Sequence, residues 1–263
     1  MPELRTTALQ TLAFAAVLLA AAAMPEAASA RQADPPAAAR ADHAAVDPPL
    51  SPFTAAYSVH RAGRQMGEAT LRLVRGTGVQ WRMDLGIRVN RGLLGLAGLD
   101  AQQSTVFVDG AAGFQPLSQG TVRQALFLDK RSNGRFDWNA GTAQWSGDIG
   151  QHRRQPVTLR AGDMSGLLVN LAVVRDARPG VQLTYRVVDN GRAREHRYAV
   201  SAQKEGLTVN GIDYLAMRVQ RTDQDDEQTV FWIADGVPTP IRILKREDGK
   251  DVYDLQLVQY QGA

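Results

Sequence analysis

The 263-residue sequence contains no cysteine. This absence excludes disulfide bonds, a thiolate nucleophile, a cysteine-ligated metal and a lipid-anchored N-terminal cysteine. Lysine is also scarce, because 26 of the 30 basic residues are arginine. The arginines are spread along the whole chain and do not gather in one basic block with interleaved aromatic residues. We therefore expect no nucleic-acid binding.

Long hydrophobic runs are missing apart from residues 12–24, which follow the basic Arg5. That run is too short for a membrane-spanning helix, and Ala28-Ser29-Ala30 fits a cleavage site. We therefore expect a signal peptide at 1–30, a periplasmic protein and no transmembrane span in the mature chain. An uncleaved N-terminal anchor is the alternative. Residues 31–51 are rich in Ala, Pro and Asp and predict a disordered linker, with one domain at 52–263.

Catalytic and cofactor-binding motifs are lacking as well. His60, His152 and His196 are isolated and show no metal-ligand spacing, and no glycine-rich phosphate loop or dinucleotide fingerprint occurs. Ser165 lacks the flanking glycines of a nucleophile elbow. The acidic run Asp223–Glu227 lacks the glycine and closing glutamate of a calcium loop and is more typical of a solvated hairpin tip. We expect no metal, no cofactor and no enzymatic activity.

What the chain does contain is alternation of apolar and polar residues. It is clearest at Val79–Val89, where Trp81 and every second residue after it is apolar while Arg82 and Arg88 lie between. This pattern predicts a strand with one buried and one solvated face, as in an antiparallel sheet. Asn190-Gly191 and Asp248-Gly249 are typical of two-residue hairpin turns.

These signals predict an all-β fold, mainly antiparallel. Large twisted sheets seldom stay open, so we expect a single strongly curled sheet that forms a barrel or half-barrel. Nearly every connection has hairpin length, which predicts pairing between neighbours in sequence. A turn is expected at Arg131–Gly134. The expected strands are 53–60, 67–75, 79–89, 101–108, 115–120, 122–130, 135–138, 142–145, 181–189, 192–201, 207–210, 212–221, 229–234, 241–247 and 252–260.

One amphipathic helix is expected at Asp163–Arg175. Asp163 would be its N-cap, and the following apolar residues have helical spacing. The chain cannot continue as helix through Pro179-Gly180. Because its apolar face is broad, the helix is expected to cover the concave side of the sheet.

A glycine- and leucine-rich segment, Asn90–Asp100, interrupts the alternation. It predicts either a mobile apolar loop at the mouth of a cavity or, as we favour, a loop packed under the sheet. Phe136, Trp138 and Trp145 predict either an aromatic platform for a ligand or, again favoured, cross-strand packing. The candidate ligand-binding residues are Leu93, Leu94, Leu96, Leu99, Trp81, Leu168 and Leu171.

Three stretches together resemble a known bacterial family. They are FTAAYSVHRAGRQMGEATLRL from residue 53, the Asp163-Met164-Ser165 opening of the expected helix, and FWIADGVPTPIRILKREDGKDVYDLQLVQY from residue 231. They resemble domain of unknown function 3108, a family of envelope proteins, over about 52–261. The resemblance implies a periplasmic, β-rich protein with no established activity and supplies no catalytic residue.

Three functions are compatible with these observations. The first is a non-enzymatic binder or carrier of an apolar small molecule such as a lipid, since a curled sheet under an apolar helix can enclose a cavity. The second is a structural module that contacts another envelope protein, for which an exposed apolar patch or a long open edge strand is expected. The third is a hydrolase whose catalytic residues are dispersed in sequence, for which a histidine and a carboxylate should converge in a cleft.

Overall fold

The computed structural model describes residues 49–91, 100–111, 113–125, 128–224 and 226–262. The expected signal peptide and nearly all of the expected linker lie outside these residues. So does most of the leucine-rich segment, including Leu93, Leu94, Leu96 and Leu99.

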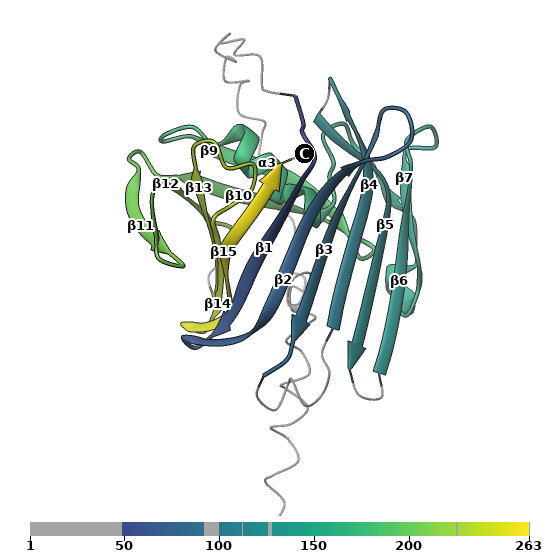
Figure 1. Ribbon diagram of the computed structural model, residues 1–263. Helices are drawn as coiled ribbons and strands as arrows, with labels where there is room; N and C mark the ends of the chain where they lie inside the picture. The colour runs from purple at the N-terminus through teal and green to yellow at the C-terminus, as the bar shows by residue number, and fades with distance from the viewer. Residues whose placement is uncertain (1–48, 92–99, 112, 126–127, 225, 263) are drawn as a thin grey trace, which may run out of the picture.

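The described chain forms one antiparallel sheet of fifteen strands (Figure 1). The all-β prediction is therefore confirmed. The strands are β1 Phe53–Arg61, β2 Arg64–Arg75, β3 Gln80–Val89, β4 Asp100–Gly110, β5 Gly113–Ala125, β6 Leu128–Asp137, β7 Thr142–Gly147, β8 Val157–Thr158, β9 Gln182–Asp189, β10 Arg192–Val200, β11 Glu205–Val209, β12 Ile212–Arg221, β13 Glu227–Ala234, β14 Arg242–Glu247 and β15 Lys250–Gly262.

Neighbours in sequence are neighbours in the sheet almost throughout. The strand order is β8-β7-β6-β5-β4-β3-β2-β1-β15-β14-β13-β12-β10-β9, with β11 paired to β12 beside this path. The pairing of β1 with β15 joins the first strand to the last, in a register that runs from Phe53 opposite Gly262 to His60 opposite Asp254. Two runs of hairpins thus become one continuous sheet.

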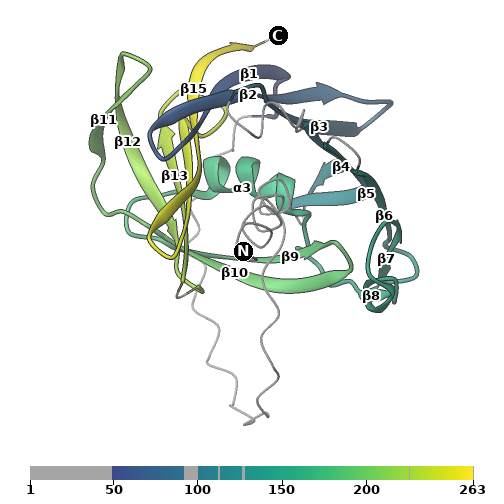
Figure 2. The same ribbon diagram turned by 90° about the horizontal axis from the view of Figure 1, so that it is seen from below.

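The sheet curls into a nearly closed barrel that surrounds the helix α3 (Val169–Asp176), as Figure 2 shows. Its two end strands, β8 and β9, do not pair with each other along their length. The chain between them crosses the gap instead, because Met164 forms a parallel bridge with Val187 of β9. The backbone N–H of Met164 donates to the carbonyl of Arg186 at 3.1 Å, and that of Val188 donates to the carbonyl of Met164 at 2.8 Å.

This bridge also moves the start of the helix. A 3₁₀ turn, η3 (Gly166–Leu168), comes first and α3 follows directly. Asp163 is therefore not an N-cap, contrary to the sequence-based expectation. Its buried carboxylate accepts a hydrogen bond from the N–H of Arg160 at 2.8 Å and forms an ion pair with Arg186 of β9. Met164 and Ser165 separate Asp163 from η3, so the N-cap position falls on Ser165 instead.

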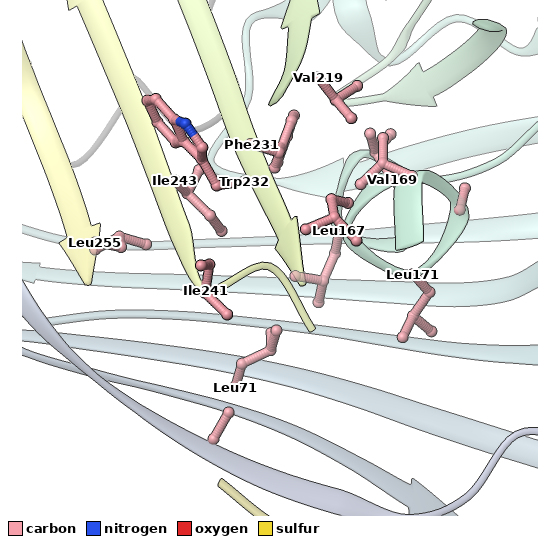
Figure 3. Packing of buried hydrophobic residues seen from close by; sticks show 14 of the residues in the cluster. Leu71, Leu167, Val169, Leu171, Val219, Phe231, Trp232, Ile241, Ile243 and Leu255 are labelled. Atoms are coloured by element: carbon pink, nitrogen blue, oxygen red, sulfur yellow. The ribbon is translucent and has the colours of Figure 1, made fainter. Parts of the chain in front are cut away.

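The core lies between the sheet and the helical segment. Leu167, Val169 and Leu171 of this segment belong to the same buried cluster as Leu71 and Phe231 of the strands (Figure 3). The strands supply their share through alternation, as in β2, where buried residues occupy every second position from Gly67 to Leu73. The predicted placement of the helix on the concave side is confirmed.

One predicted turn is wrong. Asn133-Gly134 lies inside β6 and not between strands. Gly134 is paired with Trp145 of β7, and a Cβ atom on Gly134 would lie 2.6 Å from the indole ring. The glycine is needed here because the tryptophan ring covers its backbone. In addition, β5 continues through Gly120 as one strand, where the sequence predicted a break between 115–120 and 122–130.

A second buried contact connects β1 to the chain between β13 and β14. The hydroxyl of Tyr57 lies 2.6 Å from that of Thr239 and donates to the carbonyl of Pro240 at 2.9 Å. Tyr57 and Thr239 are both buried. Burial without such partners would be costly, so these bonds define how the proline-containing connection packs against the sheet.

Two glycines on the paired strands β2 and β3 allow a direct test of the packing. Gly67 lies beside a β-bulge, and a Cβ atom there would come within 2.0 Å of the carbonyl oxygen of Arg88. A Cβ atom on Gly86 would meet nothing within 4 Å. Backbone atoms cannot move aside as a flexible side chain can. Gly67→Ala should therefore lower the free energy of unfolding by about 2 kcal/mol or more, and Gly86→Ala should change it by no more than about 0.5 kcal/mol.

Urea denaturation of the two variants measures this difference. Equal stabilities for Gly67→Ala and Gly86→Ala would contradict the described β2–β3 packing.

Candidate functional site

A cavity of about 150 Å³ lies inside the barrel, between α3 and the strands β9, β10 and β12–β15. Much of its wall is apolar or aromatic. These lining residues come from eight strands and from α3, so the closure of the sheet creates the space. They are Tyr57, Leu71, Leu85, Val169, Val187, Tyr198, Phe231, Ile243, Tyr253 and Leu255.

The cavity wall becomes polar toward the turn between β9 and β10. In β10, the residues of the inner face are Arg192, Arg194, His196 and Tyr198, and all four line the cavity. In β9 the inner face changes from Val187 to Asp189 at the end of the strand. The cavity therefore has an apolar part and a charged part, the latter formed at the β9–β10 turn.

Basic side chains outnumber acidic ones around the cavity. Five basic residues line it, against the two acidic residues Asp189 and Glu227. The basic residues are Arg153, Arg192, Arg194, Arg221 and Lys245. Burial, together with the positive charge of neighbouring arginines, lowers the pKa of both Arg153 and Arg194 below the ordinary value for arginine. The positive charges of these guanidinium groups therefore repel one another.

Acidic groups near this cluster have specific partners in the fold. Lys245 forms ion pairs with Glu227 at 3.1 Å and with Glu247 at 2.8 Å. Arg221 forms one with Asp223 at 2.7 Å. The Asp223 carboxylate also accepts a hydrogen bond from the backbone N–H of Arg197 at 2.9 Å. These pairs place carboxylates beside Arg221 and Lys245 in the cavity wall. The charge of Glu227 also acts on Arg194, where it partly offsets the lowering of the pKa.

Asp189 is the other acidic residue of the cavity wall. It accepts a hydrogen bond from the Gln119 amide at 2.7 Å and a longer one from the N–H of Gly166 at 3.3 Å. Burial raises its pKa to about 6, although these hydrogen bonds and nearby Arg123 act in the opposite direction. The carboxylate is thus held between strands at a cost in solvation.

A polar recess adjoins the cavity and shares Arg153, Asp189 and Asn190 with it. Its volume is also about 150 Å³, and it extends the excess of basic groups beyond the barrel mouth. Burial, with a contribution from the charge of Arg153, lowers the pKa of Arg123 in its wall. The other charged residues of the recess are Lys130, Arg131 and Asp148.

Three of the seven candidate ligand-binding residues named from the sequence belong to the described part of the chain, and none of these three lines the cavity. Trp81, Leu168 and Leu171 are buried in the core and are not among the lining residues. The four leucines of 93–99 lie outside the described residues, so their role stays a prediction. Sequence reasoning missed the inner face of β10. The signal was present, because Arg192 and Arg194 share the face of the apolar Tyr198 and Val200, where a buried side was expected.

The aromatic residues expected near one another do pack across strands. The rings of Phe136 and Trp145 are edge to face, 5.4 Å apart. Trp138 packs against the same cluster, and its indole N–H donates to the carbonyl of Pro116 at 2.7 Å. This geometry agrees with cross-strand packing.

Among the described residues that line the cavity, there is one histidine and no serine. His196 is in its wall, and its Nδ1 lies 3.4 Å from the hydroxyl of Tyr198. Burial and the charge of Arg221 lower the pKa of His196 to about 4. The hydroxyl of Ser165 instead lies 3.0 Å from that of Thr105.

The part of the chain that the structure describes holds neither a group of metal ligands nor a helix that could span a membrane. No three His, Asp or Glu side chains of this part are grouped so as to hold a metal ion. In the same part of the chain, no helix has the length and apolar character needed to cross a membrane.

The pKa of Asp189 gives a pH-dependent prediction. Because the folded protein holds this proton up to about pH 6, while the ordinary value is 3.8, stability is lost as the pH rises through this interval. Asp189→Asn removes the ionisation. Relative to the wild type, the variant should gain about 1–2 kcal/mol in free energy of unfolding between pH 4 and pH 7.5. Urea denaturation at several pH values measures this difference, and a constant difference would contradict the burial described here.

The fold has a counterpart among solved structures. A β-barrel-like protein of the domain of unknown function DUF1849 from Brucella abortus aligns with a TM-score of 0.50 at 11% sequence identity. The alignment covers 81% of this chain and 98% of that chain. At this identity the similarity concerns the fold alone. Among curated proteins, none matches this chain.

Sequence comparison with protein families gives a match over most of the folded chain. The matching model is described as a protein of unknown function, DUF3108, and it covers residues 56–256. This range begins in β1 and ends in β15, the two strands whose pairing joins the halves of the barrel. The predicted resemblance is confirmed, and the chain belongs to the DUF3108 family.

Proposed function

We propose that this protein binds an apolar or lipid-like small molecule in the interior of its barrel, without catalysing a reaction, in the bacterial periplasm. The observation that carries the proposal is the cavity beside α3, whose wall includes Val187, Phe231 and Leu255. The apolar part of this wall favours an apolar occupant, because a water molecule against it would lack hydrogen-bond partners.

The size of the cavity limits what enters it. A dry cavity of about 150 Å³ in another protein holds benzene, whereas sites for drug-sized molecules measure about 300–1,000 Å³. The space of about 150 Å³ described here therefore suits a short apolar segment. We infer that the rest of the ligand lies at the charged mouth.

A role as a purely structural module has less support. The end strand β8 has two residues, and β9 at the other end is bridged by Met164. Six large apolar side chains are exposed among the described residues. Ile212 and Leu215 lie on β12, Val258 and Tyr260 lie on β15, and Val79 and Val181 lie outside the strands. Single exposed apolar residues and pairs of them are ordinary on a protein surface.

A hydrolase has less support. His196 lines the same cavity as the carboxylates of Asp189 and Glu227, but its imidazole lies against Tyr198. The hydroxyl of Ser165 contacts that of Thr105 and is not in the cavity wall. Each of these side chains has a structural partner. The proposed function is therefore binding.

Filling the cavity tests the proposal. Octan-1-ol should shift the methyl resonances of Val169 and Val187 in the wild type, and Val187→Phe should weaken this binding at least about tenfold because the added ring occupies the space. Val258→Phe makes the same change on an exposed position of β15 and should leave the binding unchanged. Methyl NMR titration measures both, and thermal denaturation checks that each variant is folded.

A second measurement uses protein that keeps any small molecule bound in the cell. Native mass spectrometry of protein purified from the periplasm should reveal a bound small molecule that solvent extraction removes. A clean ligand-free mass, together with no octan-1-ol shift, would overturn the proposal.

A further inference from the structure

The polar recess beside the cavity is lined by basic side chains from three separate parts of the fold. Arg123 comes from β5, Lys130 from β6 and Arg153 from the 3₁₀ turn η2 (Gln151–Arg153). The volume of the recess, about 150 Å³, is several times what one water molecule needs, so a small oxyanion fits. The recess is therefore a polar hollow of a different character from the apolar part of the cavity.

The register of the β5–β6 hairpin places two of these charges directly opposite each other. Arg123 pairs with Lys130, and the next rung on the same face pairs Thr121 with Ser132. All four residues line the recess. Like charges directly opposite each other on a sheet are unfavourable. The hairpin thus presents two adjacent cations and two hydroxyl groups to one hollow, at a cost in stability.

Arg153 adds a third positive charge beside this hairpin. The β9–β10 turn lies close against it, since a Cβ atom on Gly191 would come within 2.0 Å of the carbonyl oxygen of Arg153. Burial is the main reason that the pKa of Arg123 lies below the ordinary value for arginine, and the charge of Arg153 lowers it further. Three cations from three elements therefore act on the same space.

Two carboxylates also line the recess, and hydrogen bonds from the fold hold both of them. The Asp148 carboxylate accepts from the backbone N–H of Arg131 at 2.8 Å. Asp189 accepts from Gln119 and from Gly166. The charge of Asp189 acts on Arg123 and partly offsets the lowering of its pKa. The recess thus contains acidic groups as well, but its basic residues outnumber them by four to two.

The donors of the three basic side chains remain available to a ligand. Among the residues that the structure describes, the side chains of Arg123, Lys130 and Arg153 form no hydrogen bond and no ion pair with another residue. A guanidinium donates two parallel hydrogen bonds to an oxyanion, and a lysine ammonium adds a compact charge. A tetrahedral oxyanion carries oxygen atoms on every side, so it suits donors that come from different walls of one hollow.

We propose that the recess binds a phosphate or sulfate group through Arg123, Lys130 and Arg153. This second site lies beside the cavity and does not depend on the binding of an apolar molecule there. The bound group is either a free ion or the end of a phosphorylated molecule, since Lys130 is exposed and the recess reaches solvent on its side.

Isothermal titration calorimetry at low ionic strength tests the site with defined ligands. Inorganic phosphate should bind, and glycerol, an uncharged molecule, should not. Arg123→Gln should weaken phosphate binding at least about tenfold, because it removes charge-assisted hydrogen bonds. Arg135→Gln is the matched control, since Arg135 is exposed on the opposite face of β6 and does not line the recess. It should leave the affinity for phosphate unchanged.

Glycerol 1-phosphate separates the two sources of the bound group. An affinity at least about tenfold above that of inorganic phosphate supports a phosphorylated molecule as the ligand. An equal or lower affinity supports the free ion.

Thermal denaturation of Lys130→Gln gives a readout that a purely structural role would not move. Without phosphate, this substitution removes the repulsion opposite Arg123 and should raise the Tm by about 1–3 °C. In phosphate, compared with NaCl of equal ionic strength, the variant should show a smaller rise in Tm than the wild type. Arg153→Gln should also reduce this rise.

Two results would overturn the proposal. One is the absence of binding for both phosphate and sulfate up to about 10 mM, where even a weak site would be occupied. The other is an affinity for phosphate that survives Arg123→Gln, Lys130→Gln and Arg153→Gln alike. If Arg123→Gln does not fold, Lys130→Gln decides the question, because Lys130 is exposed and its replacement removes no buried contact.

Discussion

The pairing of β1 with β15 is the constraint on which the rest of the structure depends. It joins strands from opposite ends of the folded chain, whereas nearly all other pairs join neighbours in sequence. Such a long-range contact carries a cost in chain entropy that local hairpins avoid. Strands β2 to β8 extend the sheet from β1, and strands β14 to β9 extend it from β15. The two halves therefore form one curved sheet only through the β1–β15 pair.

The helical segment decides how much of the resulting interior is filled. Leu167, Val169 and Leu171 pack against the strands, as Figure 3 shows, but α3 has only eight residues. A short helix fills one part of a barrel of this width and leaves another part open beside it. The bridge between Met164 and Val187 holds the start of this segment against β9. The cavity lies beside the segment, and the β9–β10 turn forms part of its wall.

The open part is where the strands stop following the rule that inner faces are apolar. Asp189, Arg192 and Arg194 continue the inner faces of β9 and β10 with charged groups. These charged groups lose solvation there. Burial therefore raises the pKa of Asp189 and lowers the pKa of Arg194. Perturbed pKa values in a cleft are typical of functional sites. They agree with the proposal that a small molecule binds in this cavity.

The sequence predicted the strands and most of the hairpin turns. Alternation over 79–89 and the Asn-Gly and Asp-Gly turns predicted antiparallel hairpins, since side-chain period and turn geometry depend on a few adjacent residues. The same local signals misplaced the turn at Asn133-Gly134, because the need for glycine there arises from Trp145 on the next strand. They misplaced the role of Asp163 for a similar reason, since its partner Arg186 lies on β9.

The sequence by itself determined the fold class, the hairpin order and the apolar character of the helix, all of which depend on short-range patterns. Only the tertiary structure decided that the inner face of β10 turns toward a cavity, and that Arg153 from a separate element joins Arg192 and Arg194. The inside and outside of a barrel strand are defined by closure of the sheet, which no single strand contains. The site is therefore a product of the curvature that brings distant strands around one space.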